Sequence, residues 1–219
     1  MSEQGSPEWF ELRRGRATAS RFSDVLAGGK ELKSRTGYRN QLVVERLTGQ
    51  VAKSFRNKHT DRGTAQEPLA RMAYEAETGY MVERSGFIPH PSLMAGGSPD
   101  GLVNSDGGVE IKSVLPLVQF STIDSGGIPT EHIPQVQGLL WLTDRRWWDF
   151  VSYSPTLPEN LQLYIHRIYR DEAYIRDLEF KMIVFLLEIG TSVNLRTSWR
   201  LQFTVANDFK EEQNEPTGT

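Results

Sequence analysis

The chain has 219 residues, 38 % of them hydrophobic and 24 % charged, a composition typical of a single globular domain. It contains no cysteine, which excludes disulfides, zinc–thiolate sites and iron–sulfur clusters, and no apolar run approaches the roughly 20 residues of a membrane span. The net charge of -3 argues mildly against a surface that coats nucleic acid throughout, but it allows local basic surfaces. The first ten residues lack the apolar core of a signal peptide, so we expect a cytoplasmic protein.

Two short helices are predicted before residue 50. The first covers 18–26, with Thr18 or Ser20 as the cap of its N-terminus and Gly28 with Gly29 at its end. The second covers 36–48, because apolar residues recur there at helical spacing before a glycine. The residues that support this second helix are Tyr38, Leu42, Leu47 and Gly49.

A longer helix is predicted over 64–78. Thr64 would cap it, Glu67 would take its third position, and Pro68 would fall in its first turn, where proline is tolerated. Gly79 would end it. Its expected apolar stripe consists of Leu69, Met72, Ala73 and Ala76.

After residue 80 the spacing of apolar residues changes to two, which indicates strands. Strands are predicted over 80–87, 93–95, 101–104 and 109–114, and the turn composition of 104–108 predicts a hairpin between the last two. A helix over 132–142, strands over 147–153 and 161–169, and a helix over 171–189 follow. This order indicates an α/β fold with a mixed central β-sheet flanked by helices, as one domain over 1–206 with a polar tail over 207–219.

The predicted hairpin carries the pattern that indicates chemistry. Asp100 stands just before its first strand, and Glu110, Ile111 and Lys112 lie on its second. Residues two apart on a strand face the same side, so Glu110 and Lys112 project together, and the turn can bring Asp100 alongside. Two convergent carboxylates and the Ile111 carbonyl suit Mg²⁺ or Mn²⁺. An ammonium beside them can hold or deprotonate a water and offset charge on a phosphate.

The same spacing also occurs in solvated hairpins that carry no more than a marginal ion pair. The apolar flanks favour a core hairpin instead, and they consist of Leu102, Val103, Val109, Ile111 and Val114.

Three further blocks accompany S-P-D-G at 98–101 and E-x-K at 110–112. They are W-x-x-L-R-x-G-x-x-T-A-S at 9–20, Gly63-x-x-x-Glu67, and Q-V-Q-x-x-x-W at 135–141. In this order and spacing they resemble the phage lambda exonuclease family, the YqaJ-type viral recombinase nucleases. That family lies within the restriction-endonuclease-like superfamily of D…E-x-K nucleases.

The resemblance implies functional residues position by position. A site for two Mg²⁺ ions, with Mn²⁺ as a substitute, would be formed by Asp100, Glu110, Ile111 and Glu67. Lys112 would position or activate the attacking water. The 5′-phosphate of the digested strand would be bound by Arg13, Ser20, Ser98 and Gln137.

Ordinary structural roles compete with some of these assignments. Glu67 suits the positive end of a helix dipole, Arg13 lies in an arginine-rich run, and Ser20 suits a helix cap. The adjacent tryptophans Trp147 and Trp148 are expected in the core rather than as platforms for base stacking. The four histidines have no ligand spacing and are expected to be structural or exposed.

The resemblance implies a Mg²⁺-dependent exodeoxyribonuclease that digests double-stranded DNA ends in the 5′→3′ direction. It would release 5′-mononucleotides and leave 3′ single-stranded tails for recombination. It also implies a ring-shaped homotrimer and a single-strand annealing protein as partner, in the cytoplasm of a bacterium or a phage-infected cell.

Two alternatives remain open. The first is a RecB-like or sequence-specific endonuclease of the same superfamily, against which only the block around Arg13 argues. The second is a non-catalytic protein that binds DNA ends, against which the intact Asp100, Glu110 and Lys112 set argues.

Overall fold

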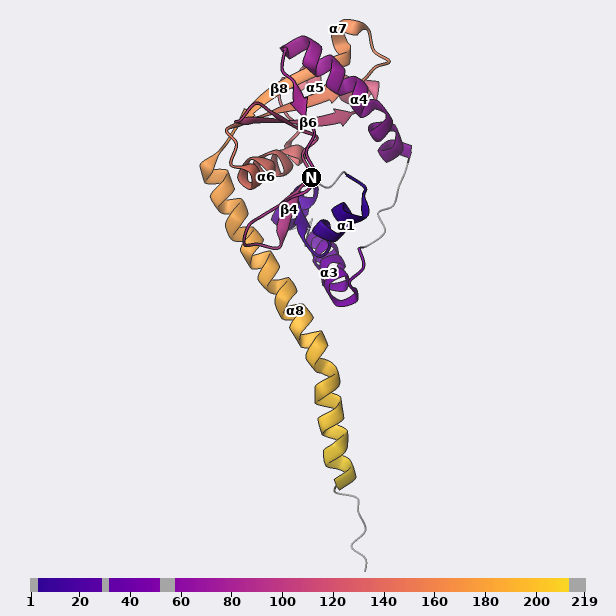
Figure 1. Ribbon diagram of the computed structural model, residues 1–219, viewed down its shortest axis with the longest axis vertical. Helices are drawn as coiled ribbons and strands as arrows, with labels where there is room; N and C mark the ends of the chain where they lie inside the picture. The colour runs from indigo at the N-terminus through magenta and orange to yellow at the C-terminus, as the bar shows by residue number, and fades with distance from the viewer. Residues whose placement is uncertain (1–3, 29–31, 52–57, 213–219) are drawn as a thin grey trace, which may run out of the picture.

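The computed structural model describes residues 4–28, 32–51 and 58–212, and side chains within these ranges except at 58–64 and 199–212. Its strands form two sheets, one of three strands in the order β1-β4-β3 and one of five in the order β2-β5-β6-β7-β8 (Figure 1). The small sheet consists of β1 (Ala17–Thr18), β3 (Ile88–Pro89) and β4 (Ala95–Gly97). The large sheet consists of β2 (Val82–Glu83), β5 (Gly101–Val103), β6 (Gly107–Ser113), β7 (Trp147–Tyr153) and β8 (Leu163–Tyr169).

The large sheet is mixed, as predicted. β6 and β7 run parallel, and the other neighbours run antiparallel. Parallel strands cannot be joined by a tight turn, so the chain crosses over through α5 (Pro116–Ser125), a turn at Thr130–His132 and α6 (Ile133–Thr143). The predicted hairpin between β5 and β6 is confirmed, with Gly101 opposite Val109.

Helices cover both faces of the large sheet. On β7, Trp147 and Val151 belong to the apolar cluster that includes Tyr74 of α4 (Lys58–Thr78). Trp148 points to the opposite face and joins the cluster around α6. This alternation follows from the two-residue period of a strand. The two faces therefore have separate apolar layers.

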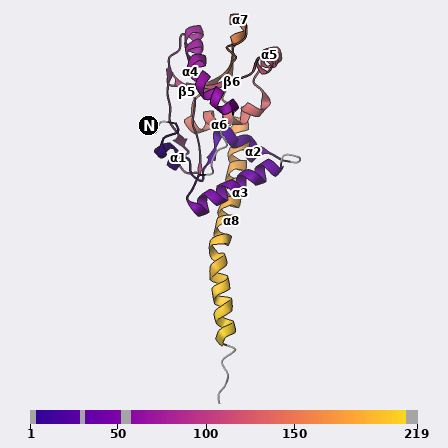
Figure 2. The same cartoon turned by 90° about the vertical axis from the view of Figure 1, so that its right-hand side faces the viewer.

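The larger apolar cluster lies among helices. Most of its members come from α2 (Phe22–Leu26), α3 (Leu32–Thr48), α6 and α8 (Glu172–Glu212). Figures 1 and 2 show α8 crossing α3 and then projecting beyond the other elements. Within the described ranges, no helix is long and apolar enough to cross a membrane.

The region predicted as a helix over 18–26 has three parts. Thr18 belongs to β1 and pairs with Gly96, so it does not cap a helix. Its backbone amide donates to the Tyr38 hydroxyl oxygen at 2.8 Å. A 3₁₀ turn over Ala19–Arg21 follows, and the helix begins only at Phe22. Ser20 lies in that turn and provides no side-chain cap.

The prediction for α4 was wrong at its start and in most of its buried face. The helix begins at Lys58, so Thr64 lies inside it, although Gly79 ends it as predicted. Of the expected stripe, Ala73 packs against the apolar cluster, but Leu69 and Met72 are 51 % and 64 % exposed. The inner face instead consists of Glu67, Ala70, Arg71 and Tyr74, at helical spacing. Because two residues of this inner face, Glu67 and Arg71, are polar, the spacing of apolar residues did not indicate the face correctly.

Several elements differ from the predictions in extent. The strand expected over 80–87 is reduced to β2, and β3 and α5 were not predicted. Two short helices, α1 (Pro7–Arg13) and α7 (Glu159–Gln162), were not predicted either. α8 continues past residue 189 to Glu212, so part of the expected tail is helical. The rest of that tail, 213–219, lies outside the described residues.

Candidate active site

The hairpin brings the predicted acidic pair together. Extending the register of β5 and β6 by one residue places Asp100 opposite Glu110, so both side chains leave the same face of the sheet. The Asp100 carboxylate accepts a hydrogen bond from the Ile111 backbone amide at 2.7 Å. Because the amide and carbonyl of one strand residue point to the same side, the Ile111 carbonyl also faces Asp100.

Glu110 is the most deeply buried residue of the site, at 2 % exposure. Its Oε1 atom accepts two hydrogen bonds of 2.6 Å, one from Lys112 Nζ and one from Gln135 Nε2. Its Oε2 atom is buried and has no hydrogen-bond partner among the described residues. Buried carboxylate oxygens are normally paired, so this atom is available to a ligand.

The site carries more negative than positive charge. Burial, followed by the nearby charge of Glu110, raises the pKa of Asp100 well above its ordinary value. Burial lowers the pKa of Lys112, but the charges of Glu110 and Asp100 outweigh it and leave the pKa raised. One ammonium thus faces two carboxylates. A bound cation would relieve the remaining repulsion between the carboxylates.

The donor set fits a hard divalent cation. Asp100, the free oxygen of Glu110 and the Ile111 carbonyl are all oxygen donors, which Mg²⁺ and Mn²⁺ prefer. Glu67 does not complete the set here, because its Oε1 atom accepts a hydrogen bond from Arg71 Nη2 at 2.6 Å. Consistently, no group of three acidic or histidine side chains arranged to hold a metal occurs in the described part of the chain.

Arg13 and Ser98 lie on either side of Trp9, which was not among the predicted site residues. The Arg13 guanidinium lies over the Trp9 ring at 4.5 Å, and the indole Nε1 donates to Ser98 Oγ at 2.9 Å. No hydrogen bond or ion pair of the Arg13 side chain occurs within the described part of the chain, although its carbonyl accepts one from the Arg16 amide. The W-x-x-x-R spacing of one helical turn is the signal for this contact.

Ser20 lies at the same end of the small sheet as Ser98. It follows β1, Ser98 follows β4, and these two strands are parallel. The Ser20 side chain is exposed. The described contacts thus connect Arg13 and Ser98 through Trp9, and Ser20 is placed only by the parallel strands. A guanidinium and hydroxyls are groups that can bind an anion.

Gln137, predicted to help bind the 5′-phosphate, has its side-chain amide engaged at another place. The amide donates to the Tyr169 carbonyl at 3.0 Å and accepts from the Asp171 amide at 3.1 Å, so it joins the end of β8 to the start of α8. Gln135, which was not predicted, is the glutamine of this motif that contacts Glu110 and Lys112. Residues two apart on a helix point about 200° away from each other, so the two glutamines cannot share one partner.

Of the remaining candidates, the two tryptophans and two of the histidines make structural contacts, and the His59 side chain lies outside the described residues. Trp147 and Trp148 are buried, as predicted. His132 stacks on Phe150 with ring centroids 5.3 Å apart, beside the site. Burial and the charge of Lys112 lower its pKa to about 4, so its imidazole is neutral. His90 accepts hydrogen bonds from the Ser92 and Leu93 amides and closes a turn.

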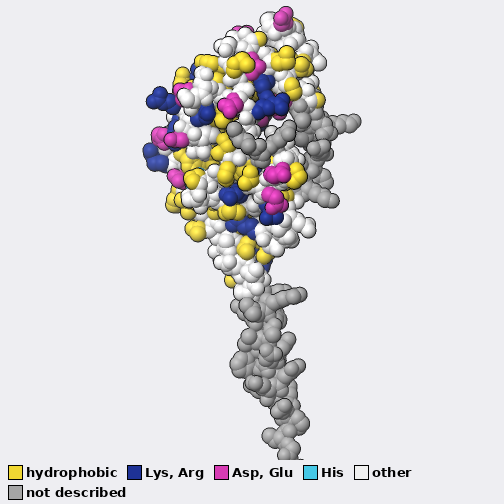
Figure 3. All heavy atoms as spheres, in the orientation of Figure 1, with side chains coloured by type: hydrophobic (Ala, Val, Ile, Leu, Met, Phe, Trp, Pro, Cys, Tyr) yellow, Lys and Arg dark blue, Asp and Glu magenta, His cyan; other side chains and the backbone are white. Residues whose placement is uncertain are grey.

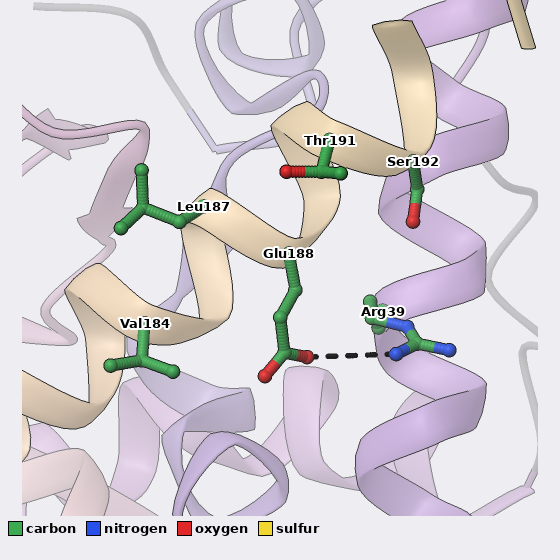
Figure 4. A pocket seen from close by; sticks show the side chains of 6 residues that line it. All are labelled: Arg39, Val184, Leu187, Glu188, Thr191 and Ser192. Carbon is green, nitrogen blue, oxygen red and sulfur yellow. Dashed lines mark ion pairs between the residues drawn. The ribbon is translucent and has the colours of Figure 1, made fainter. Parts of the chain in front are cut away.

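A separate hollow of about 420 Å³ lies between α3 and α8 (Figure 4). It is lined by Arg39, Val184, Leu187, Glu188, Thr191 and Ser192, none of which belongs to the site above. Figure 3 shows acidic, basic and apolar side chains mixed over one face of the molecule, without a single basic field. This agrees with the small net charge.

Comparison with known proteins identifies a family for this chain. Residues 8–146 match the model of the YqaJ-like viral recombinase domain. The alkaline exonuclease LHK-Exo from Laribacter hongkongensis is 38 % identical, with a TM-score of 0.85 over 90 % of this chain and 100 % of that chain. The complex of LHK-Exo with dAMP is 39 % identical over the same shares, with a TM-score of 0.83.

A phage-related exonuclease from Haemophilus somnus 129PT has a TM-score of 0.64 at 14 % identity, over 82 % of this chain and 95 % of that chain. This likeness supports the fold alone. No curated protein sequence matched. The family match covers more than half of the chain and includes Arg13, Glu67, Asp100, Glu110 and Lys112. The chain therefore belongs to the YqaJ-like viral recombinase family.

Proposed function

We propose that this protein is a metal-dependent exodeoxyribonuclease that digests one strand of duplex DNA from its 5′ end. It would release 5′-mononucleotides and leave a 3′ single-stranded tail. The observation that carries the proposal is the unpaired, buried Oε2 atom of Glu110 beside Asp100 and Lys112. LHK-Exo, an alkaline exonuclease whose structure holds dAMP in one complex, supports a nucleic-acid substrate.

Asp100, Glu110 and the Ile111 carbonyl would hold the cation, with Glu67 as a further carboxylate nearby. A divalent cation bound there, Mg²⁺ or Mn²⁺ and two ions by family resemblance, lowers the pKa of bound water and offsets charge on the scissile phosphate. The protein's part is to fix the direction of its oxygen atoms. The bonds from Lys112 and Gln135 saturate one oxygen of Glu110 and leave the other for the ligand.

Burial lowers the pKa of Lys112, but in the cation-free protein the charges of Glu110 and Asp100 outweigh it and raise the pKa, so Lys112 is an ammonium in that state. An ammonium donates hydrogen bonds and cannot accept a proton. We therefore assign it to orienting the attacking water and to stabilising negative charge on the pentacovalent phosphate. Gln135 holds it in place through a hydrogen bond of 3.2 Å from Nζ to Oε1.

Arg13, with Ser98 and Ser20 nearby, would bind the 5′-phosphate of the digested strand. Trp9 supports this role, because its ring holds the guanidinium and its indole holds Ser98. An enzyme that retains the newly formed 5′-phosphate can advance one nucleotide at a time. We include in the proposal the homotrimeric ring and the single-strand annealing partner, which rest on family resemblance.

The test is digestion of linear duplex DNA labelled at one 5′ end, in Mg²⁺, in Mn²⁺ and in EDTA. We expect cation-dependent release of labelled mononucleotide, lowered about 10²- to 10³-fold in Lys112→Ala. Covalently closed circular DNA should remain intact. Removal of the 5′-phosphate should slow the wild type and leave Arg13→Ala, already slow, little changed.

Two outcomes would overturn the proposal in different ways. Cutting of the closed circle would retain the metal site but identify an endonuclease of the same superfamily. Absence of hydrolysis by folded wild type with either cation would favour a protein that only binds DNA ends.

A further inference from the structure

Arg71 is a buried cation that none of the roles above includes. Its side chain is 12 % exposed and points from α4 toward the hairpin. The Nη2 atom donates to Glu67 Oε1 at 2.6 Å and to the Asp100 carbonyl at 3.3 Å. Its Nε atom is buried without a hydrogen-bond partner among the described residues. The Arg71 guanidinium is thus hydrogen-bonded to the backbone of Asp100, the first residue of the acidic pair.

Glu67 is close enough to the site to act on it electrostatically. Its negative charge contributes to the raised pKa of Asp100, after burial and the charge of Glu110. Even so, its Oε1 atom is directed to Arg71, one helical turn away on the same face of α4. Arg71 and a cation beside Asp100 would therefore compete for the same carboxylate.

We propose that Arg71 restrains Glu67 and thereby weakens cation binding in the DNA-free protein. Arg71 is a positioning residue in this inference, which rests on the proposed function only in requiring a divalent cation at Asp100 and Glu110. Two effects act in the same direction. The ion pair must break before Glu67 can turn to the cation, and the guanidinium itself repels a second positive charge.

The second hydrogen bond of Arg71 explains how the restraint can be released without loss of the fold. When Glu67 turns away, the guanidinium still donates to the Asp100 carbonyl. If Arg71 instead only held Glu67 in the orientation that binds the cation, the opposite result would be expected. In that case, replacing Arg71 would weaken cation binding, because Glu67 would lose its orientation.

The two directions are separated by Mn²⁺ binding without DNA, measured by calorimetry and by the loss of the free-ion signal in electron paramagnetic resonance. We expect Arg71→Gln to bind Mn²⁺ about five- to tenfold more tightly than wild type, the effect of releasing a half-buried ion pair. Arg71→Lys, which keeps the charge, should change the affinity less. Arg71→Ala, which also removes the charge, is the test variant if Arg71→Gln is unstable.

A double-mutant cycle identifies Glu67 as the group involved. The gain from Arg71→Gln should largely disappear in a Glu67→Gln background, because no carboxylate remains to be released. Lys181→Gln is the matched control, since Lys181 forms a pair of the same spacing and length with Asp177 on the exposed surface of α8. It should leave Mn²⁺ affinity unchanged.

Unchanged or weaker Mn²⁺ binding by folded Arg71→Gln or Arg71→Ala than by wild type would overturn this inference and leave the proposed function intact. If neither the wild type nor these two variants bound Mn²⁺, the metal site of the proposed function would fail and the inference with it.

Discussion

Two buried acidic residues on adjacent strands lie on opposite faces of the large sheet. Glu110 on β6 is 2 % exposed, and Asp149 on β7 is 1 % exposed. Asp149 is saturated, since Arg167 donates to both of its oxygens at 2.8 Å and the Tyr74 hydroxyl donates at 2.7 Å. Glu110 has one oxygen saturated and one without a partner. Burial alone does not distinguish the two residues, but hydrogen-bond saturation does.

The surroundings of Asp149 are those of a structural element. The Arg167 guanidinium lies 3.7 Å from the centre of the Trp147 ring, and burial with the bond to Asp149 raises the pKa of Tyr74. Around Glu110 a like charge, Asp100, is only partly compensated by Lys112. Proteins commonly sacrifice stability at functional sites in this way. The comparison predicts that mutations on one face affect activity and mutations on the other affect stability.

The largest expected effect is on activity, from Glu110→Gln. Loss of a cation-binding oxygen should reduce nuclease activity about 10³-fold or more. The free energy of unfolding without metal should stay the same or rise, because repulsion with Asp100 disappears. Mononucleotide release and urea unfolding in EDTA measure the two quantities. A large loss of stability would mean that Glu110 is a structural residue like Asp149.

Asp149→Ala should have the next largest effect, on stability. It leaves Arg167 and Tyr74 without their partner, and breaking a buried pair in this way costs about 3–5 kcal/mol. The midpoint of urea unfolding should fall accordingly, while activity per folded molecule at low temperature stays near that of wild type. Asp177→Ala, which breaks an exposed ion pair, is the control and should cost less than about 1 kcal/mol. If Asp149→Ala and Asp177→Ala lowered the free energy of unfolding equally, Asp149 would not be a stabilising residue and the proposed difference between the two faces of the sheet would be wrong.

Sequence patterns predicted those parts of the site that depend on local geometry. The turn at 104–108 and the two-residue period determine the hairpin, and the hairpin alone brings Asp100, Glu110 and Lys112 together. Family resemblance added Arg13 and Ser98, each of which contacts Trp9. Their roles in chemistry stay predictions until the nuclease assay is done.

Parts that depend on how helices rest on the sheet could not be predicted. Gln135 and Gln137 stand in one motif, and only the rotation of α6 about its axis decides which of them meets Glu110. On α4 the polar residues Glu67 and Arg71 lie on the inner face, so the apolar residues indicated the wrong side. Functional side chains depart from the pattern that otherwise identifies a buried face.

The two glutamines offer a smaller test of the same comparison. Gln135→Ala should lower activity about 10- to 100-fold, because it orients Glu110 and Lys112, with little change in stability. Gln137→Ala should do the reverse, since it leaves two backbone groups unpaired, at a cost of about 1–3 kcal/mol. Nuclease rates and urea midpoints of both variants check this. Similar profiles would contradict the placement of the two residues.

The smallest expected effect is a change of protein stability with pH that comes from His132, which lies on the active-site face of the sheet. The pKa of His132 is about 4 in the folded protein, below its ordinary value of 6.5, so the unfolded chain takes up this proton first as pH falls. The contribution of the neutral imidazole to stability is therefore complete above pH 6.5, declines between 6.5 and about 4, and is constant below. His132→Phe keeps a ring against Phe150 and removes the titration.

The melting temperature of wild type should consequently fall relative to His132→Phe across this interval and not above it. Thermal unfolding from pH 8 to pH 3.5 in EDTA measures the difference between the two proteins. Parallel curves would mean that the imidazole titrates alike in the folded and unfolded chains, and that Lys112 and burial do not keep it neutral beside the carboxylates. A difference in melting temperature that grows as the pH falls would show that His132 stays neutral in the folded protein. Lys112 would then carry the positive charge next to Glu110.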